Sequence, residues 1–414
     1  MLDTAALRRP FPYLRASSQS GHPVIYLDNA ATAQKPQVVI DALQAAYADG
    51  TGNVHRGMHE LSERTTVAYE AARERVRKFL DAQNTEEIIF TRNATEAINL
   101  VVISLSRGGM FQKGDRVILS ILEHHSNIVP WMQLKERKGI EILWIDCDEH
   151  GQLNMDQYEK FLHEGRVKMV SITGQSNVLG VRPELTKMIT LAHAHGAKML
   201  VDAAQLVAHG SINVSSLDCD FLAFSGHKVF GPTGIGVLYG KRELLEAMPP
   251  FLGGGMMIRE VTTEGFTPAD LPMKFEAGTP PAAEAIALHA AIDWMESMNR
   301  SEVEDHERAL LTRAIEKLGT VEGLRILGPG DAAKIFGCVS FVIEGIHPHD
   351  LTHLLGERGI ALRAGHHCTQ PLHKRLGINA STRLSVAPYN TLEEIDHACT
   401  AIQDIVTFLR GTKE

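Results

Sequence analysis

The sequence has no long apolar run, no surplus of basic residues and no apolar stretch near its start. A membrane-spanning helix needs roughly 20 apolar residues in succession, and a signal peptide needs an apolar central region. The formal net charge is −9, whereas surfaces that bind nucleic acid are basic. These absences predict a cytoplasmic protein that binds neither membranes nor nucleic acid.

Cysteine is scarce, and its five positions form no pattern that would crosslink the chain or hold a metal. Their number is odd, and no pair has the CxxC spacing of a redox or zinc motif. We therefore expect no disulfide framework and no metal site. A free cysteine is most often a small buried apolar residue, and we interpret four of the five in this way: Cys147, Cys219, Cys338 and Cys399.

The chain is long enough to form more than one domain. Its 414 residues are 44% hydrophobic and 22% charged, which is the balance of an ordinary globular protein. We expect a large domain over residues 26–295 and a small C-terminal domain over 296–414. Residues 1–25 are predicted to be an N-terminal segment that packs with the small domain.

Short β-rich runs alternate with helical patterns between about residues 85 and 240. Several runs are almost entirely apolar, as expected for strands covered by helices on both faces. The alternation predicts an α/β fold whose large domain contains a mainly parallel, doubly wound sheet. Helices are predicted over Thr95–Ser106 and Leu185–His195. The predicted strands are Glu87–Thr91, Arg116–Ser120, Glu141–Ile145, Met169–Thr173, Met199–Asp202, Phe221–Ser225 and Gly236–Tyr239.

The last third of the chain is predicted to form a long helix followed by a smaller α+β domain. A helical pattern runs from Ala282 to about Leu318 without an obvious break. Val339–Ile343 and Thr382–Val386 are predicted strands, and Ile395–Leu409 is a predicted closing helix. Residues 361–371 are predicted to be a loop between elements of the small domain.

Lys228 comes three residues after the end of an apolar predicted strand. In a parallel sheet, ligands bind beyond the carboxyl ends of the strands. Partial burial at that place lowers the pKa of an amine and makes it a nucleophile toward an aldehyde. A solvated loop lysine is the alternative, which this segment taken alone favours.

Asp202 ends another of the predicted strands. A carboxylate in that position could hold a proton on the ring nitrogen of a pyridine-type cofactor. Taken alone, it could equally cap the following helix. Its combination with Lys228 favours the cofactor interpretation, and Gln205 could then hydrogen-bond a hydroxyl group on the ring.

Two further segments follow predicted strands. Ala94 and Thr95 lie between a predicted strand and the helix that begins near Glu96. Free amides, the helix dipole and the threonine hydroxyl could hold a phosphate there; simple capping is the alternative. In Glu123-His124-His125, an imidazole could stack on a ring. A metal site is the other interpretation, although adjacent histidines rarely chelate one ion.

These motifs together resemble the class V, fold-type I enzymes that use pyridoxal 5′-phosphate, and among them the group II cysteine desulfurases of the SufS type. The resemblance covers essentially the whole chain. The chain differs from the family pattern in two places. It has Gly174-Gln175 where relatives often have His-Val, and it has Ala94 where they often have a second Thr. The matching motifs are YLDNAATAQKP (26–36), HRGMHELS (55–62), RNATEAIN (92–99), EHHSNIVPW (123–131), SNVLG (176–180), LVDAAQ (200–205), DCDFLAFSGHKVFGPTGIG (218–236), FEAGTP (275–280) and RAGHHCTQPL (363–372).

The resemblance implies that the large domain binds pyridoxal 5′-phosphate. Lys228 would join the aldehyde of the cofactor, Asp202 would pair with its ring nitrogen, and Gln205 would bind its 3-hydroxyl. His125 would stack on the ring as a further catalytic residue. The groups implied to hold the phosphate are Ala94, Thr95, Ser225, His227 and, from the second subunit of a homodimer, Thr279.

The resemblance also implies a site for an amino-acid substrate. Asn177, Arg363 and Arg383 would bind it, with Arg383 gripping the α-carboxylate through a bidentate pair. His55 and Arg56 would lie near the site from across the subunit interface. The implied substrate is L-cysteine, with L-selenocysteine as a second one.

Cys368 lies in the polar segment Arg363–Cys368, which also contains His366 and His367. Cationic neighbours favour the reactive thiolate. A buried apolar cysteine is one alternative. A His-His-Cys metal site is another, but three consecutive residues do not converge easily on one tetrahedral ion. With the resemblance, the segment predicts that Cys368 receives the substrate's sulfur as a persulfide while alanine is formed.

Sulfur transfer to a SufE- or SufU-like acceptor protein, for iron–sulfur cluster assembly, is implied by the resemblance alone. Another class V reaction, such as that of an aminotransferase, an epimerase or a kynureninase-like hydrolase, would share Lys228 and Asp202 but would need no thiol. A catalytically silent scaffold for sulfur-assembly proteins would need none of these groups. The presence of Lys228, Asp202 and Cys368 together favours the desulfurase.

Overall fold

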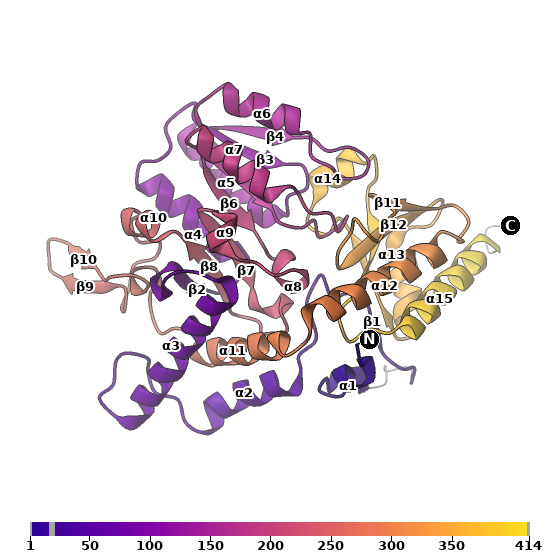
Figure 1. The fold of residues 1–414 in the computed structure, drawn as a ribbon, viewed down its shortest axis with the longest axis horizontal. Helices are drawn as coiled ribbons and strands as arrows, with labels where there is room; N and C mark the ends of the chain where they lie inside the picture. Colours follow the sequence, from indigo (N-terminus) through magenta and orange to yellow (C-terminus); the bar gives the residue numbers. More distant parts are fainter. Residues whose placement is uncertain (1, 16–20, 412–414) are drawn as a thin grey trace.

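The computed structural model describes residues 2–15 and 21–411. A large seven-stranded sheet with its helices lies beside a smaller four-stranded sheet with helices of its own (Figure 1). Of the predicted N-terminal segment, residues 1 and 16–20 lie outside the described part of the chain.

The seven-stranded sheet has the order β2-β8-β7-β6-β5-β3-β4. Strands β4, β3, β5, β6 and β7 pair in parallel, and β8 is antiparallel to both of its neighbours. The predicted α/β class with a mainly parallel sheet is confirmed. The strands are β2 (Ile88–Thr91), β3 (Arg116–Ser120), β4 (Glu141–Ile145), β5 (Val167–Thr173), β6 (Lys198–Asp202), β7 (Phe221–Ser225) and β8 (Gly236–Gly240).

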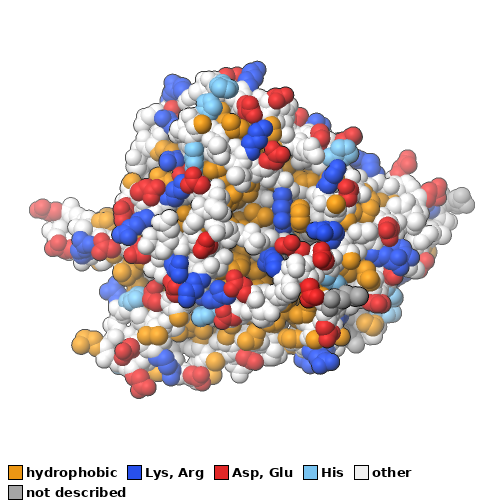
Figure 2. All heavy atoms as spheres, in the orientation of Figure 1, with side chains coloured by type: hydrophobic (Ala, Val, Ile, Leu, Met, Phe, Trp, Pro, Cys, Tyr) orange, Lys and Arg blue, Asp and Glu red, His pale blue; other side chains and the backbone are white. Residues whose placement is uncertain are grey.

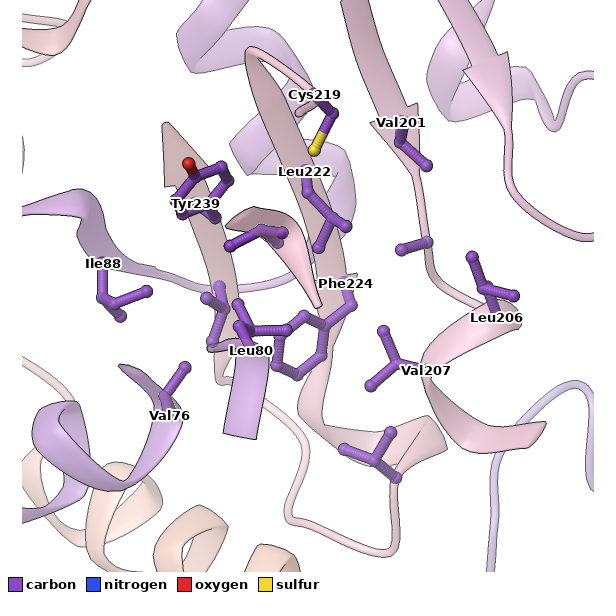
Figure 3. Close-up of a cluster of buried hydrophobic side chains, with 14 of the residues drawn as sticks. Val76, Leu80, Ile88, Val201, Leu206, Val207, Cys219, Leu222, Phe224 and Tyr239 are labelled. Carbon is purple, nitrogen blue, oxygen red and sulfur yellow. The ribbon is translucent and has the colours of Figure 1, made fainter. Parts of the chain in front are cut away.

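Helices cover both faces of this sheet because successive strand residues point to opposite sides. Val201 and Leu222 pack with Val76 and Leu80 (Figure 3), whereas Leu200, beside Val201, belongs to the core on the other face. The first face is covered by α3 (Glu60–Leu80), α6 (Met155–His163), α7 (Leu185–Ala194) and α11 (Ala282–Glu296). The other face is covered by α4 (Ala94–Arg107) and α5 (Val129–Lys138).

The uninterrupted helix predicted from Ala282 to Leu318 is wrong. The structure has two helices, α11 and α12 (Arg300–Leu318), with a break after Glu296. Asn299 caps the second helix by accepting a hydrogen bond from the amide of Glu302. Such caps satisfy the free amides of a first turn. The apolar periodicity continues across the break, so Asn299 was the one local feature that indicated the start of a second helix.

The four-stranded sheet is antiparallel throughout, in the order β11-β12-β15-β14. Residues 361–371, predicted to be a loop, contain the end of β13, all of β14 and the start of α14. Strand β14 is only three residues long, contains no large apolar side chain, and is held by pairing with β15. The elements are β11 (Leu324–Leu327), β12 (Cys338–Ile343), α13 (Pro348–Glu357), β13 (Ile360–Ala361), β14 (Arg363–Gly365), α14 (Gln370–Arg375), β15 (Ser381–Ser385) and α15 (Leu392–Gly411).

The start of the chain contacts both units. Strand β1 (Ile25–Tyr26) pairs in parallel with β13, and the Phe11 ring packs edge-on against Trp294 and Tyr389. The Arg8 guanidinium donates to the Tyr389 carbonyl at 2.8 Å. The remaining helices are α1 (Thr4–Arg8), α2 (Gln37–Ala48), α8 (Leu206–His209), α9 (Val214–Leu217) and α10 (Arg242–Ala247).

A two-stranded hairpin, β9 (Ile258–Val261) and β10 (Phe266–Pro268), projects from the large unit (Figure 1). Acidic and basic side chains are interspersed over the face in Figure 2, without a continuous basic area. Among the described residues, no helix combines the length and apolarity that crossing a bilayer requires.

Candidate active site

A cavity of about 220 Å³ opens at the carboxyl edge of the seven-stranded sheet. Its wall includes Thr173, Asp202 and Ser225, which end β5, β6 and β7. Thr173 and Asp202 are register partners, so their side chains leave the sheet at the same level. The order of parallel strands thus brings together residues that are far apart in the sequence.

Most of the predicted cofactor and substrate residues line this one cavity. They come from the start of α4, the ends of β6 and β7 and the segments that follow them, the segment after β5, and two strands of the small sheet. These residues are Ala94, Thr95, Asn177, Asp202, Gln205, Ser225, His227, Lys228, Arg363 and Arg383. The predicted residues His55, Arg56, His125, Thr279 and Cys368 are not part of the wall.

Lys228 and Asp202 face the same cavity with opposite charges. Burial lowers the pKa of the Lys228 amine to about 8, while the Asp202 carboxylate acts in the opposite direction. Burial raises the pKa of Asp202, and the charge of Lys228 opposes that shift. Near neutral pH the amine is therefore much closer to its neutral, nucleophilic form than an exposed lysine would be.

The part of the cavity wall at the start of α4 is rich in hydrogen-bonding groups. The amide of Ala94 donates to Ser225 Oγ at 2.9 Å, and Thr95 Oγ1 lies 2.6 Å from Ser126 Oγ. These groups stand at the N-terminus of α4, a helix of 14 residues whose dipole favours an anion. Ser126 was missed from the sequence because nothing local shows that it meets Thr95. The hydroxyls and amides suit a phosphate group.

The structure places His124 on the cavity wall, where the sequence analysis placed its neighbour His125. His124 Nδ1 accepts a hydrogen bond from the Ser126 amide at 3.1 Å, so its proton is on Nε2. Burial, then the charge of Lys228, lowers the pKa of His124 to about 3. His125 instead lines a separate surface groove. The 3₁₀ turn His125–Asn127 decides which ring faces the cavity, and the sequence could not.

A buried polar network supports the segment that carries His124. The Glu123 carboxyl is fully buried and contacts Ser120 Oγ and, at 2.7 Å, Asn127 Nδ2. Asn127 Oδ1 also accepts from Ser171 Oγ at 2.5 Å. Burial raises the pKa of Glu123 to about 8, so this carboxyl is largely protonated at neutral pH. The network joins the ends of β3 and β5 beneath the cavity.

Arg383 is the main cation on the substrate side of the cavity. Its guanidinium is 1% exposed and donates to the Asn177 carbonyl at 3.0 Å and to Asp28 Oδ1 at 2.9 Å. Its Nε is buried without a hydrogen-bond partner among the described residues. A buried donor left unpaired is costly, so this group is suited to a carboxylate ligand. The sequence did not predict the pairing of Arg383 with Asp28, because the two residues are 355 positions apart in the chain.

Cys368 lies in a turn that is hydrogen-bonded to His125 and to Asn177 of the cavity wall. The Cys368 carbonyl accepts from the amide of His125 at 2.7 Å, and the His367 carbonyl accepts from Asn177 Nδ2 at 2.7 Å. His367 and Cys368 have φ values of 50° and 59°, a left-handed conformation that costs non-glycine residues roughly 1 kcal/mol or more each. These two hydrogen bonds hold the turn in that shape. Cys368 itself is half-buried.

The structure corrects the expectation that His367 is a cationic neighbour that favours the thiolate of Cys368. His367 is buried, with Nε2 3.0 Å from Ser381 Oγ. Burial, then the charge of Arg383, lowers its pKa to about 2. His367 is therefore neutral at physiological pH and supplies no positive charge, which leaves Arg363 as the fixed cation of this segment.

His55, Arg56 and Thr279 lie away from the cavity within this chain. His55 and Arg56 line a surface depression together with Ile258 of the β9–β10 hairpin, and His55 Nε2 is 3.1 Å from Glu70 Oε1. Thr279 is exposed. Over residues 2–15 and 21–411, no cluster of three His, Cys, Asp or Glu side chains is arranged to hold a metal ion.

The cavity residues fit the chemistry of pyridoxal 5′-phosphate. A buried amine can join an aldehyde, a buried carboxylate can pair with a ring nitrogen, and the α4 end offers donors for a phosphate. The sequence profile of the aminotransferase class-V family matches residues 25–397. The chain belongs to the aminotransferase class-V family.

Relatives from this family are cysteine desulfurases. The chain is 46% identical to the cysteine desulfurase of Synechococcus elongatus, over 98% of this chain but 64% of that protein. It is 45% identical to a probable cysteine desulfurase of Synechocystis sp., over 98% and 96% of the two chains. The crystal structure of the Escherichia coli cysteine desulfurase CsdA superposes with a TM-score of 0.90, at 40% identity and 99% coverage of both chains. The predicted family and fold type are confirmed.

We expect the Lys228 amine of the cofactor-free protein to titrate near pH 8, because burial destabilises its ammonium form. Asp202→Asn should lower this midpoint further, since the carboxylate favours the ammonium. Acetylation by limiting acetic anhydride at a series of pH values, with mass mapping of the peptide that contains Lys228, gives the midpoint. The control Asp404→Asn changes an exposed carboxylate on α15 and should leave it unchanged. A midpoint near 10.5, the ordinary lysine value, would contradict the burial argument.

Proposed function

We propose that this protein is a pyridoxal 5′-phosphate-dependent cysteine desulfurase that forms L-alanine and keeps the sulfur as a persulfide on Cys368. One observation carries the proposal: a thiol-bearing turn is hydrogen-bonded to the wall of the cavity that contains Lys228 and Asp202. The names of the relatives support it. The thiol favours this reaction over the other class V reactions, which have no use for it.

The bound cofactor would supply an aldehyde that joins to amines and a ring that accepts the electrons of the substrate's α-carbon. Lys228 would hold the aldehyde, and Asp202 would keep a proton on the ring nitrogen. Gln205 is already oriented by donating from Nε2 to the Ala30 carbonyl at 2.7 Å, and it would meet the ring hydroxyl. The phosphate would be held by Ala94, Thr95, Ser126, Ser225 and His227.

Arg383 and Asn177 would bind the α-carboxylate of L-cysteine, with Arg363 beside them. When the substrate amine replaces Lys228, the released Lys228 amine can take the α-proton, because burial keeps its pKa near 8. His124 is neutral with a proton on Nε2, so it would face the ring without adding a charge. We therefore assign the ring-stacking role to His124 in place of His125.

Cys368 would then act as the nucleophile. Its thiolate attacks the sulfur of the substrate, a sulfur–sulfur bond forms, and the bond between that sulfur and the β-carbon breaks. The electron pair stays with the β-carbon, which takes a proton and becomes the methyl group of alanine. No oxidant is consumed, and the product on the enzyme is the Cys368 persulfide.

A second copy of the chain would complete the site as a homodimer. Thr279, His55 and Arg56 lie outside the wall of their own cavity, and His55 and Arg56 lie next to the projecting hairpin. A two-fold assembly would carry them to the partner's cavity.

We also propose a SufE- or SufU-like sulfur acceptor and a role in iron–sulfur cluster assembly. A cytoplasmic location suits five free cysteines and a catalytic thiol.

Cys368→Ala should keep the visible absorbance of the bound cofactor yet lose at least about 100-fold in sulfide release from L-cysteine with dithiothreitol, because the nucleophile is gone. Cleavage of L-selenocysteine should persist, since selenolate leaves without thiol attack. Cys147→Ala is the control and should retain sulfide release. Normal sulfide release by Cys368→Ala would rule out the assigned nucleophile.

His124→Gln should lower kcat by about 100-fold and shift the cofactor absorbance, as expected for a group that contacts the reacting ring. His125→Gln should leave that absorbance unchanged, because its ring lines the separate groove. Absorbance spectra and alanine formation measured on both variants test the assignment. A spectral shift in His125→Gln alone would restore the assignment made from the sequence.

The homodimer is tested by mixing two inactive variants. Lys228→Ala lacks the amine, and Thr279→Tyr should block the cavity of the other subunit. If Thr279 serves its partner, co-expressed subunits regain about a quarter of wild-type activity, because half of the dimers are mixed and each has one intact site. Absence of recovery in mixed dimers that have been isolated by two affinity tags would show that Thr279 serves no partner site.

A further inference from the structure

Lys35 is a desolvated cation that the proposed mechanism does not use. It lies in the segment between β1 and α2, and its ammonium donates to the carbonyl oxygen of Ala33 and, at 2.8 Å, to that of His227. Burial lowers the pKa of the Lys35 amine to about 8, so the amine is still mostly charged near neutral pH. Both acceptors are neutral, and among the described residues no carboxylate pairs with it. Desolvated charges are normally paired, so an anion is expected nearby.

The Lys35 ammonium is fixed beside the residue that precedes the cofactor lysine. The His227 carbonyl accepts three hydrogen bonds, from the Ala33 amide at 3.1 Å, from Thr32 Oγ1 at 3.2 Å and from Lys35 Nζ. Lys228 follows His227 directly in the chain. Both His227 and Lys228 line the cofactor cavity, whereas Lys35 does not. The ammonium is therefore held against a residue of the cavity wall without occupying the cavity itself.

The part of the wall that suits a phosphate contains no charged side chain. It consists of the start of α4 together with Ser126, Ser225 and His227. Burial, then the charges of Lys228 and Lys35, lowers the pKa of His227 to about 4, so its ring is neutral at physiological pH. The helix dipole and neutral donors would thus face a doubly charged phosphate. The effect of Lys35 on His227 shows that its charge acts at this wall.

Other cations near the cavity already have partners or lie elsewhere. Arg383 comes from the small sheet, on the substrate side, and is paired with Asp28 at 2.9 Å. Arg92, beside the start of α4, has a side chain that is 75% exposed and pairs with Glu96 at 2.8 Å. Solvent and a carboxylate both weaken its action on a nearby anion. Lys35 has neither of these restrictions.

We propose that Lys35 supplies the positive charge of the phosphate subsite, and that it makes the cavity select a phosphorylated aldehyde over the same aldehyde without phosphate. The assignment rests on the part of the proposed function that places a phosphate at the start of α4. Lys35 is a positioning residue, since it acts through its bond to the His227 carbonyl and through its charge. A charge in a weakly polarisable wall acts over several ångströms, so direct contact with the phosphate is not required.

The experiment compares two aldehydes on the full-length protein after removal of the cofactor. Pyridoxal 5′-phosphate and 5′-deoxypyridoxal share the ring and the aldehyde, and only the first has the phosphate. The absorbance change when each one joins Lys228 gives its dissociation constant. We expect Lys35→Met to weaken binding of pyridoxal 5′-phosphate by at least about tenfold, and binding of 5′-deoxypyridoxal by less than about twofold.

Two further variants separate the charge from the hydrogen bond and from a general effect of substitution. Lys35→Gln retains a donor for the His227 carbonyl but has no charge, so it should lose the preference for the phosphorylated aldehyde as Lys35→Met does. Lys160→Met removes an exposed charge from α6 and should change neither constant. Equal weakening of both aldehydes in Lys35→Met, or a wild-type preference in Lys35→Gln, would overturn the assignment.

Thermal unfolding distinguishes this role from a purely structural one. Removing a charge that has no anion should leave the Tm of cofactor-free Lys35→Gln equal to that of the wild type or higher. The rise in Tm that pyridoxal 5′-phosphate produces at a fixed concentration should be smaller in the variant, because binding is weaker. A Tm of the cofactor-free variant more than about 3 °C below the wild type would show a structural role and overturn the assignment.

The wild-type protein separates failure of this assignment from failure of the proposed function. If it binds neither aldehyde, the proposed function and the role of Lys35 are both wrong. If it binds pyridoxal 5′-phosphate and releases sulfide from L-cysteine, but the Lys35 variants keep the wild-type preference for the phosphorylated aldehyde, only the role of Lys35 is wrong.

Discussion

The opposed charges of Lys228 and Asp202 in one buried cavity are the constraint on which the rest of the site depends. Burial drives the amine toward its neutral form, and the carboxylate limits that shift. Asp202 ends β6 and Lys228 follows the neighbouring strand β7, and the carboxyl ends of these strands meet at one edge of the sheet. The parallel sheet therefore places the Lys228 amine where burial makes it nucleophilic near neutral pH. The same sheet places the Asp202 carboxylate where it stabilises the ammonium form of that amine.

The small unit contributes to the same cavity through a few long-range contacts. Arg383, on β15, bonds to Asp28 and to the carbonyl of Asn177, and Asn177 bonds in turn to the His367 carbonyl, which precedes Cys368. Each contact joins segments that are distant in the sequence. The thiol and the substrate-binding cation are therefore positioned by the packing of the two sheets against each other, and by no local sequence feature.

The turn at His367 and Cys368 lies between the cofactor cavity, which His367 lines, and a separate surface groove, which His366 and Gln370 line. Its left-handed backbone is strained and is held by hydrogen bonds that its own two carbonyls accept from the amide of His125 and from Asn177 Nδ2.

The sequence by itself determined the parallel strands and the residues that end them, because nearly continuous apolar runs bounded by polar residues are local patterns. Lys228, Asp202 and Thr95 followed from strand ends, since parallel order alone brings those ends together. Only the tertiary structure decided between His124 and His125, where a single 3₁₀ turn rotates one ring toward the cavity. Tertiary packing also neutralised His367, because its protonation state depends on burial that no spacing reveals, and left Thr279, His55 and Arg56 outside their own cavity.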